Sequence, residues 1–232
     1  MNEEEIAVEV NKKFRDGIKD WMTSENSKRE KSFHVSSFVY DCTRKVWYES
    51  KYDDKVPEPP DDGLFRMWIG TKLHETPVSE SHEIPLRYNY MENWFTGRID
   101  EIMEIDGKTF IIDKKFPQRL PRTANDHYLN QVMFYAALLK KTKGIVVDGV
   151  GIHYFTPTVA YEAHGEREKT FIRFVTPEEI DKYVEKIEQM MNEVITKLKN
   201  NTLPEKNVSW YCTYCPYKVS CDAESTAYME RN

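Results

Sequence analysis

The chain has 232 residues, of which 40% are hydrophobic, and a formal net charge of −6 at pH 7. This length and composition suffice for one substantial core. An acidic protein offers a polyanion no general attraction, so nucleic-acid binding would need local basic surface or bound cations. The first residues are acidic and no segment approaches 18 uninterrupted apolar residues, so we expect neither a secretory leader nor a membrane partner, and a cytoplasmic location.

Helices are predicted for the first third of the chain. Apolar residues at helical spacing predict an amphipathic helix over 3–23. A second helix is expected after Ser36 and Ser37 and should carry Cys42. The segment 51–63, rich in proline and aspartate, is predicted to be a loop. Residues 64–76 then read as a helix with His74 near its end.

The middle of the chain changes to the period of strands. Strands are predicted at 83–91, 94–105 and 108–115, followed by a helix over 126–141, strands near 146–155 and 170–175, and a long helix to 199. Threonine, proline and two glutamates at 176–179 are a strong helix start. This order predicts an α/β fold with a mixed central sheet flanked by helices. We expect one domain over 1–232, comprising a helical part (1–78), a core (79–200) and a C-terminal segment (201–232).

A two-residue Asp106-Gly107 turn predicts the register of the hairpin between the second and third strands. In a tight hairpin of this kind, residues whose numbers sum to 213 lie opposite each other. Asp100 should therefore face Asp113, with β-carbons roughly 4.5–5.5 Å apart, and Arg98 should face Lys115. The opposite face carries the apolar residues Ile99, Met103, Ile105, Phe110 and Ile112.

Two like charges in such a position are destabilising unless a cation lies between them. Lys115 follows Asp113 by two residues and shares its face. Two carboxylates and a lysine on a rigid sheet favour a site for Mg²⁺ or Mn²⁺, at which the ammonium could assist reaction of an anionic substrate. The alternative is a solvated hairpin in which Arg98 and Lys115 only balance the acids.

Three of the four cysteines lie within ten residues, as Cys212-Thr-Tyr-Cys215 and Cys221, whereas Cys42 lies far upstream. A pair separated by two residues can place both sulfurs on one metal centre, and four thiolates complete a zinc site or an iron–sulfur cluster. Either would tie the N-terminal region to the C-terminus. Two disulfides are the third possibility, which a reducing cytoplasm disfavours.

Four motifs in order resemble those of the RecB-type nucleases in the PD-(D/E)xK superfamily. They are His74, Gly97-Arg-Ile-Asp100, Asp113-Lys-Lys115 and Gln131-Val-Met-Phe-Tyr135. The arrangement of one cysteine before this core and three after it is similar to the iron–sulfur clasp of the CRISPR-associated exonuclease branch (Cas-four type). The resemblance spans about 36–222 and implies a restriction-endonuclease-like fold with such a clasp.

The resemblance also implies a role for each matched position. The divalent cation would be held by His74, Asp100, Asp113 and the backbone carbonyl of Lys114. Lys115 would be the catalytic lysine, and Gln131 and Tyr135 would position the lysine and the DNA. A 4Fe–4S cluster would be bound by Cys42, Cys212, Cys215 and Cys221, with a two-iron form as the alternative known in the family. The pattern departs at Asp113, where this branch more often has glutamate; the shorter carboxylate can also bind metal.

The resemblance implies a metal-dependent exonuclease that hydrolyses single-stranded DNA with 5′ to 3′ polarity, with endonuclease activity as a possible companion. Its partners would be DNA with free ends, CRISPR adaptation or replication and repair proteins, and further copies of itself. Two alternatives stay open. One is a subunit that binds and trims DNA ends within a CRISPR spacer-acquisition complex. The other is a zinc-stabilised DNA-binding module without catalysis.

Overall fold

A computed structural model describes residues 10, 12–13, 16–21, 32–52, 61–156 and 167–223. The chain divides into two compact units, 1–31 with 58–76 and 32–57 with 77–232. The first unit contains α4 (Asp61–His74), which confirms the helix predicted to end near His74. The helix predicted over 3–23 lies partly outside the described residues, and those described within it are helical. The expected single domain stays a prediction.

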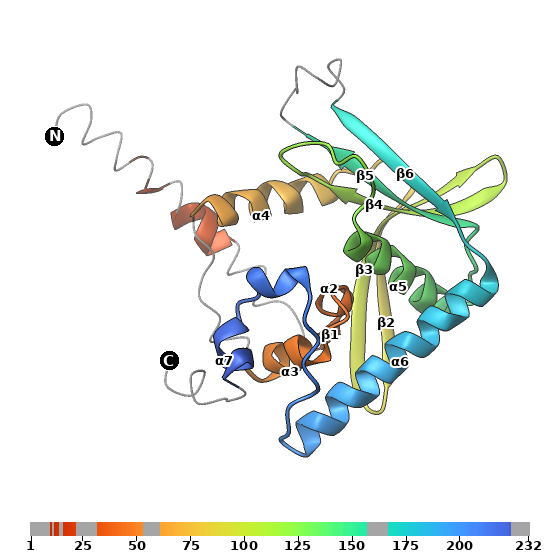
Figure 1. Cartoon of the computed structure of the whole chain (residues 1–232). Coiled ribbons are helices and arrows are strands. Elements are labelled where there is room, and N and C mark those ends of the chain that lie inside the picture. The colour runs from red at the N-terminus through yellow and green to blue at the C-terminus, as the bar shows by residue number, and fades with distance from the viewer. Residues whose placement is uncertain are drawn as a thin grey trace, which may run out of the picture. The chain divides into compact units, whose positions relative to one another are not determined.

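The second unit is built on a mixed six-stranded sheet (Figure 1). Its strands are β1 (Phe33–His34), β2 (Ser81–Tyr90), β3 (Asn93–Ile105), β4 (Lys108–Lys115), β5 (Gly149–Phe155) and β6 (Glu168–Phe174). Pairing follows the order β1-β3-β4-β5-β6, and β2 also pairs with β3. The pairs β1–β3 and β4–β5 are parallel and the others are antiparallel. The predicted α/β fold with a mixed sheet is confirmed.

The two long helices of the second unit pack in layers on the sheet. The crossover between parallel β4 and β5 is α5 (Asp126–Lys143), which packs on the sheet, and α6 (Pro177–Lys199) packs on α5 (Figure 1). A parallel pair of strands requires such a crossover. The predicted start of α6 is confirmed, because Thr176 and Glu179 form a capping box. No described helix is both long and apolar enough to cross a membrane.

The segment around Cys42 differs from the prediction. It contains the short helix α2 (Val35–Phe38) and α3 (Thr43–Tyr52), and Cys42 lies between them. The expectation of a helix carrying Cys42 was therefore wrong. Asp41 adopts a left-handed conformation with φ of 54°, which a continuous right-handed helix does not allow. The predicted loop over 51–63 is also too long, because α3 reaches Tyr52 and α4 begins at Asp61.

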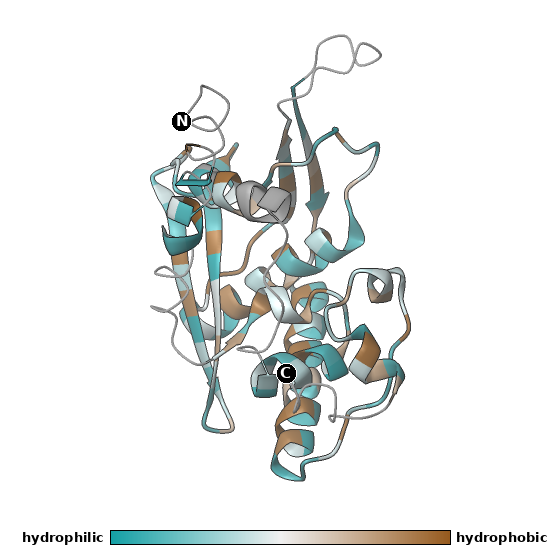
Figure 2. Cartoon of the chain, turned by 90° about the vertical axis from the view of Figure 1, so that its left-hand side faces the viewer, coloured by the Kyte–Doolittle hydropathy of each residue, from teal (hydrophilic) through white to brown (hydrophobic). Residues whose placement is uncertain are grey.

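The core lies mainly between α5 and the sheet. Eight consecutive residues of α5, from Val132 to Leu139, are buried, so this helix has apolar contacts on almost every side. Figure 2 shows hydrophobic and hydrophilic residues interspersed along the helices and strands. α5 is thus a central element, and any side chain it directs at the sheet is held in a fixed environment.

A buried ion pair fixes the hairpin of β3 and β4. Lys114 Nζ donates to Glu101 Oε1 at 2.9 Å, and both side chains are almost fully buried. The other oxygen of Glu101 accepts hydrogen bonds from the backbone and hydroxyl of Ser79, at 2.9 and 2.6 Å. Burial alone would raise the pKa of Glu101, but the bonds from Ser79 and Lys114 lower it below its ordinary value. Glu101 is therefore a buried anion that needs each of these donors.

We predict that Glu101→Gln lowers the free energy of unfolding by about 3 kcal/mol, because it leaves the Lys114 ammonium buried without its counter-charge. Urea unfolding at neutral pH measures this loss. Glu104→Gln is the matched control, because Glu104 lies on the same strand with its side chain exposed. Equal stability of the two variants would contradict a structural role for the ion pair.

Candidate active site

The predicted register of the central hairpin is confirmed. Five pairs from Ile105–Lys108 to Glu101–Ile112 all sum to 213, and the ladder ends there. Asp100 and Asp113 come directly after the last pair. At this point the Lys114 backbone N–H donates to Asp100 Oδ2 at 2.7 Å. A carboxylate thus satisfies a backbone donor where the two strands separate.

The predicted pairing of Arg98 with Lys115 was wrong. β3 pairs with β1 at Phe95 and Thr96, so β1 takes over the edge that β4 leaves. Arg98 instead lies opposite Pro85 of β2, and its Nε donates to Glu83 Oε2 at 2.7 Å. A rule based on one turn extends only as far as the two strands stay together, and here they separate at Asp100.

The two acids predicted from the register are buried, with side chains of Asp100 and Asp113 at 5% and 1% exposure. Lys115 Nζ lies 2.7 Å from Asp113 Oδ2, which confirms that these residues share a face. Burial alone would lower the pKa of Lys115, but the charges of Asp113 and Asp100 raise it above its ordinary value. Lys115 is therefore an ammonium group held against a buried carboxylate. The alternative of a solvated hairpin does not describe these acids.

The helix residues predicted for this site lie beside it. Gln131 Nε2 donates to the Tyr135 hydroxyl at 2.9 Å. Burial raises the pKa of the Tyr135 hydroxyl, and the charges of Asp113 and Asp100 raise it further. The β4–α5–β5 crossover explains the proximity, because it returns the chain over the strand that carries Asp113.

Gly97 of the Gly-Arg-Ile-Asp motif allows this packing. A β-carbon at position 97 would lie 2.8 Å from Tyr135 Cε1 and 2.8 Å from Val35 Cγ2. Both contacts are closer than real β-carbons approach other atoms. The glycine is therefore required for close approach of α5 and α2 to β3.

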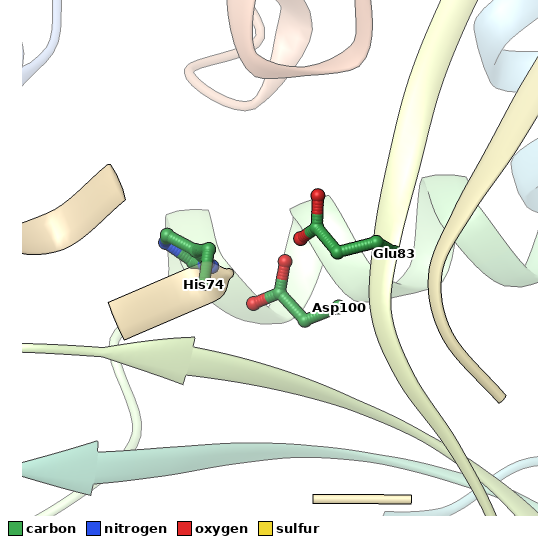
Figure 3. A group of neighbouring side chains, drawn as sticks. All are labelled: His74, Glu83 and Asp100. Atoms are coloured by element: carbon green, nitrogen blue, oxygen red, sulfur yellow. The ribbon is translucent and has the colours of Figure 1, made fainter. Parts of the chain in front are cut away.

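A third acid, Glu83 of β2, was missed by the sequence analysis. Its neighbours His82 and Ile84 pair with Glu101 and Ile99, so Glu83 lies across from Asp100 (Figure 3). A carboxylate oxygen of Glu83 lies within 4.8 Å of one of Asp100. Glu83 has a φ of 51°, which is uncommon outside glycine and which interrupts the regular pairing of β2 and β3 at this position.

The signal that could have located Glu83 is weak. The turn between β2 and β3 is Met91-Glu92, and both residues have positive φ, as in a tight hairpin. Its pairs sum to 183, which places Glu83 opposite Asp100. Methionine and glutamate are not the residues that favour such a turn, so the register could not be read from sequence.

Two further predicted ligands stay predictions. His74 is the last residue of α4 and belongs to the first compact unit, whereas Asp100 and Asp113 belong to the second. The backbone N–H of Lys114 bonds Asp100, and its side chain pairs with Glu101 on the other face of the hairpin. Lys114 is thus fixed at both its backbone and its side chain.

All four cysteines line one small cavity of about 30 Å³ in the second unit, and all four are free thiols. The Ser209 N–H donates to Cys212 Sγ at 3.4 Å, and Arg44 Nη1 approaches Cys221 Sγ at 3.9 Å. Burial raises the pKa of the Cys42 and Cys215 thiols. The buried Tyr48 hydroxyl at this cavity has no hydrogen-bond partner among the described residues.

Hydrogen bonds tie the two ends of the second unit together around this cavity. Arg44 Nε donates to the Pro204 carbonyl at 2.7 Å, and Asn207 Nδ2 donates to the Asp41 carbonyl at 2.7 Å. The rings of Tyr48 and Tyr217 stack with centroids 5.4 Å apart. The C-terminal segment is therefore attached to α3 by contacts that do not require a metal.

The sequence pattern of the PD-(D/E)XK nuclease superfamily matches residues 34–222, most of the chain. The chain belongs to the PD-(D/E)XK nuclease superfamily. This is a superfamily of hydrolases that generally use divalent metal ions and act on nucleic acid. The matched residues include the hairpin acids and all four cysteines.

Among solved structures, the crystal structure of SSO0001 is similar to this PD-(D/E)XK protein, with a TM-score of 0.60 and 20% sequence identity. The similarity covers 92% of this chain and 97% of that chain, and at this identity it shows a shared fold. An exonuclease candidate from Eubacterium rectale matches with a TM-score of 0.31 and 9% identity, over 80% and 81% of the two chains. No curated protein matches the chain.

We predict that Gly97→Ala lowers the free energy of unfolding by about 1–3 kcal/mol, because the added methyl group overpacks the contact with Tyr135 and Val35. Thermal unfolding measures the loss. Gly70→Ala in α4 is the control, since nothing lies within 4 Å of its added carbon and alanine favours helix. A stable Gly97→Ala variant would show that α5 does not need this approach.

Proposed function

We propose that this PD-(D/E)XK protein is a metal-dependent DNA exonuclease that acts on single-stranded DNA with 5′ to 3′ polarity. The observation that carries the proposal is the buried pair Asp100 and Asp113, with the Lys115 ammonium 2.7 Å from Asp113. Buried acids beside each other are costly, so a protein keeps them where a cation or substrate uses them.

The proposed cation is Mg²⁺ or Mn²⁺, held by Asp100 and Asp113 with the Lys114 carbonyl and His74. Hard cations of this kind prefer carboxylate and carbonyl oxygens, which is the donor set that β3 and β4 carry. Glu83 adds an oxygen within 4.8 Å of one of Asp100 and is a candidate further ligand. The inclusion of His74 and the Lys114 carbonyl follows from the superfamily resemblance alone.

The proposed reaction is hydrolysis of a phosphodiester. A cation bound there would neutralise a phosphate oxygen and lower the pKa of an attacking water. The water oxygen bonds to phosphorus, the bond from phosphorus to the sugar oxygen of the leaving nucleotide breaks, and that oxygen takes up a proton. The Lys115 ammonium orients the water and stabilises the negative charge of the transition state. Gln131 and Tyr135 support this geometry from α5, through their hydrogen bond.

We predict that Asp113→Asn leaves the fold intact but abolishes cation binding and cleavage, because it removes one ligand charge at nearly constant volume. Lys115→Ala should still bind the cation, while its turnover falls by roughly a hundredfold or more. Digestion of labelled single-stranded oligonucleotides with Mg²⁺ or Mn²⁺, together with calorimetric titration of the cation, separates the two effects.

The matched control for this experiment is Glu104→Asn, an exposed acid on the same hairpin whose loss should change neither quantity. Cleavage by Asp113→Asn at the parental rate would refute the assignment of the active site. End-labelled substrates report the polarity of the parent. If the purified parent binds DNA ends and cuts only with added partners, the alternative of a trimming subunit gains support.

We propose in addition that Cys42, Cys212, Cys215 and Cys221 bind a 4Fe–4S cluster. The shared cavity and the unpartnered Tyr48 hydroxyl support a bound group at this position. The preference for this cluster over a single zinc ion follows from the superfamily resemblance.

We predict that protein purified without oxygen is brown, and that Cys42→Ala loses iron and colour and unfolds at a lower temperature, because the group joins distant segments. Iron analysis, visible absorption and thermal unfolding measure these changes. Thr43→Ala, next in the chain, is the control and should keep its iron. Stoichiometric zinc without iron in the parent would support the zinc-stabilised alternative instead.

A further inference from the structure

A path of aromatic rings leads from Lys115 to the surface of the C-terminal segment. The Lys115 ammonium lies 4.8 Å from the centre of the Tyr128 ring. The rings of Tyr128 and His127 are 4.0 Å apart, and His127 lies 5.4 Å from Trp210. All these residues belong to the second compact unit. The path therefore connects the proposed active site with η3 (Trp210–Thr213).

Tyr40 holds the rings of this path in place by packing against them. Its ring stacks on Tyr211 at 3.6 Å and 14°, and on His127 at 5.3 Å and 23°. It also meets the Trp210 ring edge to face at 6.0 Å and 75°. One tyrosine thus holds η3 against the start of α5, so the orientation of Trp210 is set before any ligand arrives.

The outer end of the path is exposed. Trp210 and Tyr214 have exposed fractions of 60% and 72%, and their ring centres are 6.3 Å apart. Trp210 borders a hollow of about 490 Å³, whose other lining residues are Thr123 to His127. Neighbouring exposed aromatic rings with fixed orientation on a hollowed surface are a typical feature of a binding site.

The charges around the hollow favour stacking over phosphate binding. Its lining includes one acid, Asp126, and no lysine or arginine. Burial lowers the pKa of His127, and the charge of Lys115 lowers it further, so this ring is kept neutral beside the active site. A ligand of the hollow would therefore gain affinity from contact with flat rings.

We propose that Trp210 and Tyr214 stack with unpaired bases of single-stranded DNA and that the ring path holds the strand for delivery to Lys115. This inference rests on the proposed nuclease function. Every base has a π face, so such stacking tolerates any sequence and suits a nuclease that must advance along a strand. Bases in a duplex are covered by their neighbours, so the platform selects single strands. Continuity with Lys115 favours this occupant over an apolar protein partner.

The test compares binding of two labelled oligonucleotides of equal length, oligothymidine and its abasic analogue, without added divalent cation so that no cleavage occurs. Fluorescence anisotropy should show oligothymidine binding about tenfold weaker for Trp210→Ala, because one stacked base is lost. Trp210→Phe should keep most of the affinity. The abasic strand should bind Trp210→Ala and the parent equally, because it offers no base.

Trp94→Ala is the matched control, since Trp94 is also an exposed tryptophan of the second unit, at 42% exposure, but contacts Arg87 instead of the ring path. It should bind oligothymidine like the parent. Tyr214→Ala is a second variant in case Trp210→Ala unfolds, as monitored by circular dichroism. Parental binding of oligothymidine by both ring variants, or equal losses on both oligonucleotides, would overturn the proposal.

The result is separable from a failure of the proposed function. A parent that digests oligothymidine with Mn²⁺, while the ring variants bind like the parent, refutes the stacking platform and leaves the nuclease intact. A parent that never digests DNA but binds oligothymidine through Trp210 refutes the nuclease and leaves the platform. Ring variants that bind like the parent but lose affinity for an apolar peptide would identify a protein docking surface and overturn the proposal.

Discussion

Charge neutralisation across β4 is the constraint on which the site depends. Neighbouring residues Lys114 and Lys115 point to opposite faces of the hairpin, and each pairs with a buried carboxylate, Glu101 on one face and Asp113 on the other. On the first face, Glu101 also accepts hydrogen bonds from the backbone N–H and the hydroxyl of Ser79. The pair on the second face lies where β3 and β4 separate, and the charges of Asp113 and Asp100 raise the pKa of Lys115 above its ordinary value. One strand thus carries an ion pair on each of its two faces.

The separation of β3 and β4 follows from the same charges. Two anions directly opposite in a continued ladder would repel each other. The β3–β4 ladder ends at the pair directly before Asp100 and Asp113. The Lys114 N–H then donates to the Asp100 carboxylate, and β1 pairs with the edge of β3 that β4 leaves. The acids then lie at a fork between strands, and α5 closes it with Tyr135 because Gly97 leaves room for that ring. Local electrostatics and close packing therefore determine the same geometry.

What could be predicted from the sequence was what depends on local signals. The Asp106-Gly107 turn predicted the hairpin register, and the cap at Thr176 predicted the start of α6. The position of Glu83 was not predicted, because the β2–β3 turn at Met91-Glu92 lacks the residues that favour a tight hairpin. The predicted partner of Arg98 was wrong, because β1 replaces β4 beside β3 at this point. The role of Trp210 was not predicted for another reason. Its contacts with Tyr40 and His127 join segments more than 80 residues apart, and no spacing in the sequence encodes them.

The C-terminal segment links the two proposed sites physically. The single turn of η3 carries Cys212, which lines the cysteine cavity, and Trp210, which ends the ring path. Tyr211 between them stacks on Tyr40, directly before the loop that holds Cys42. Because these residues share one short turn, a group bound by the cysteines would also restrict the position of Trp210. The rings of the path would then keep their orientation only while the cysteine segment is in place. Through packing alone, the cysteine cavity would therefore influence how the rings next to Lys115 are arranged.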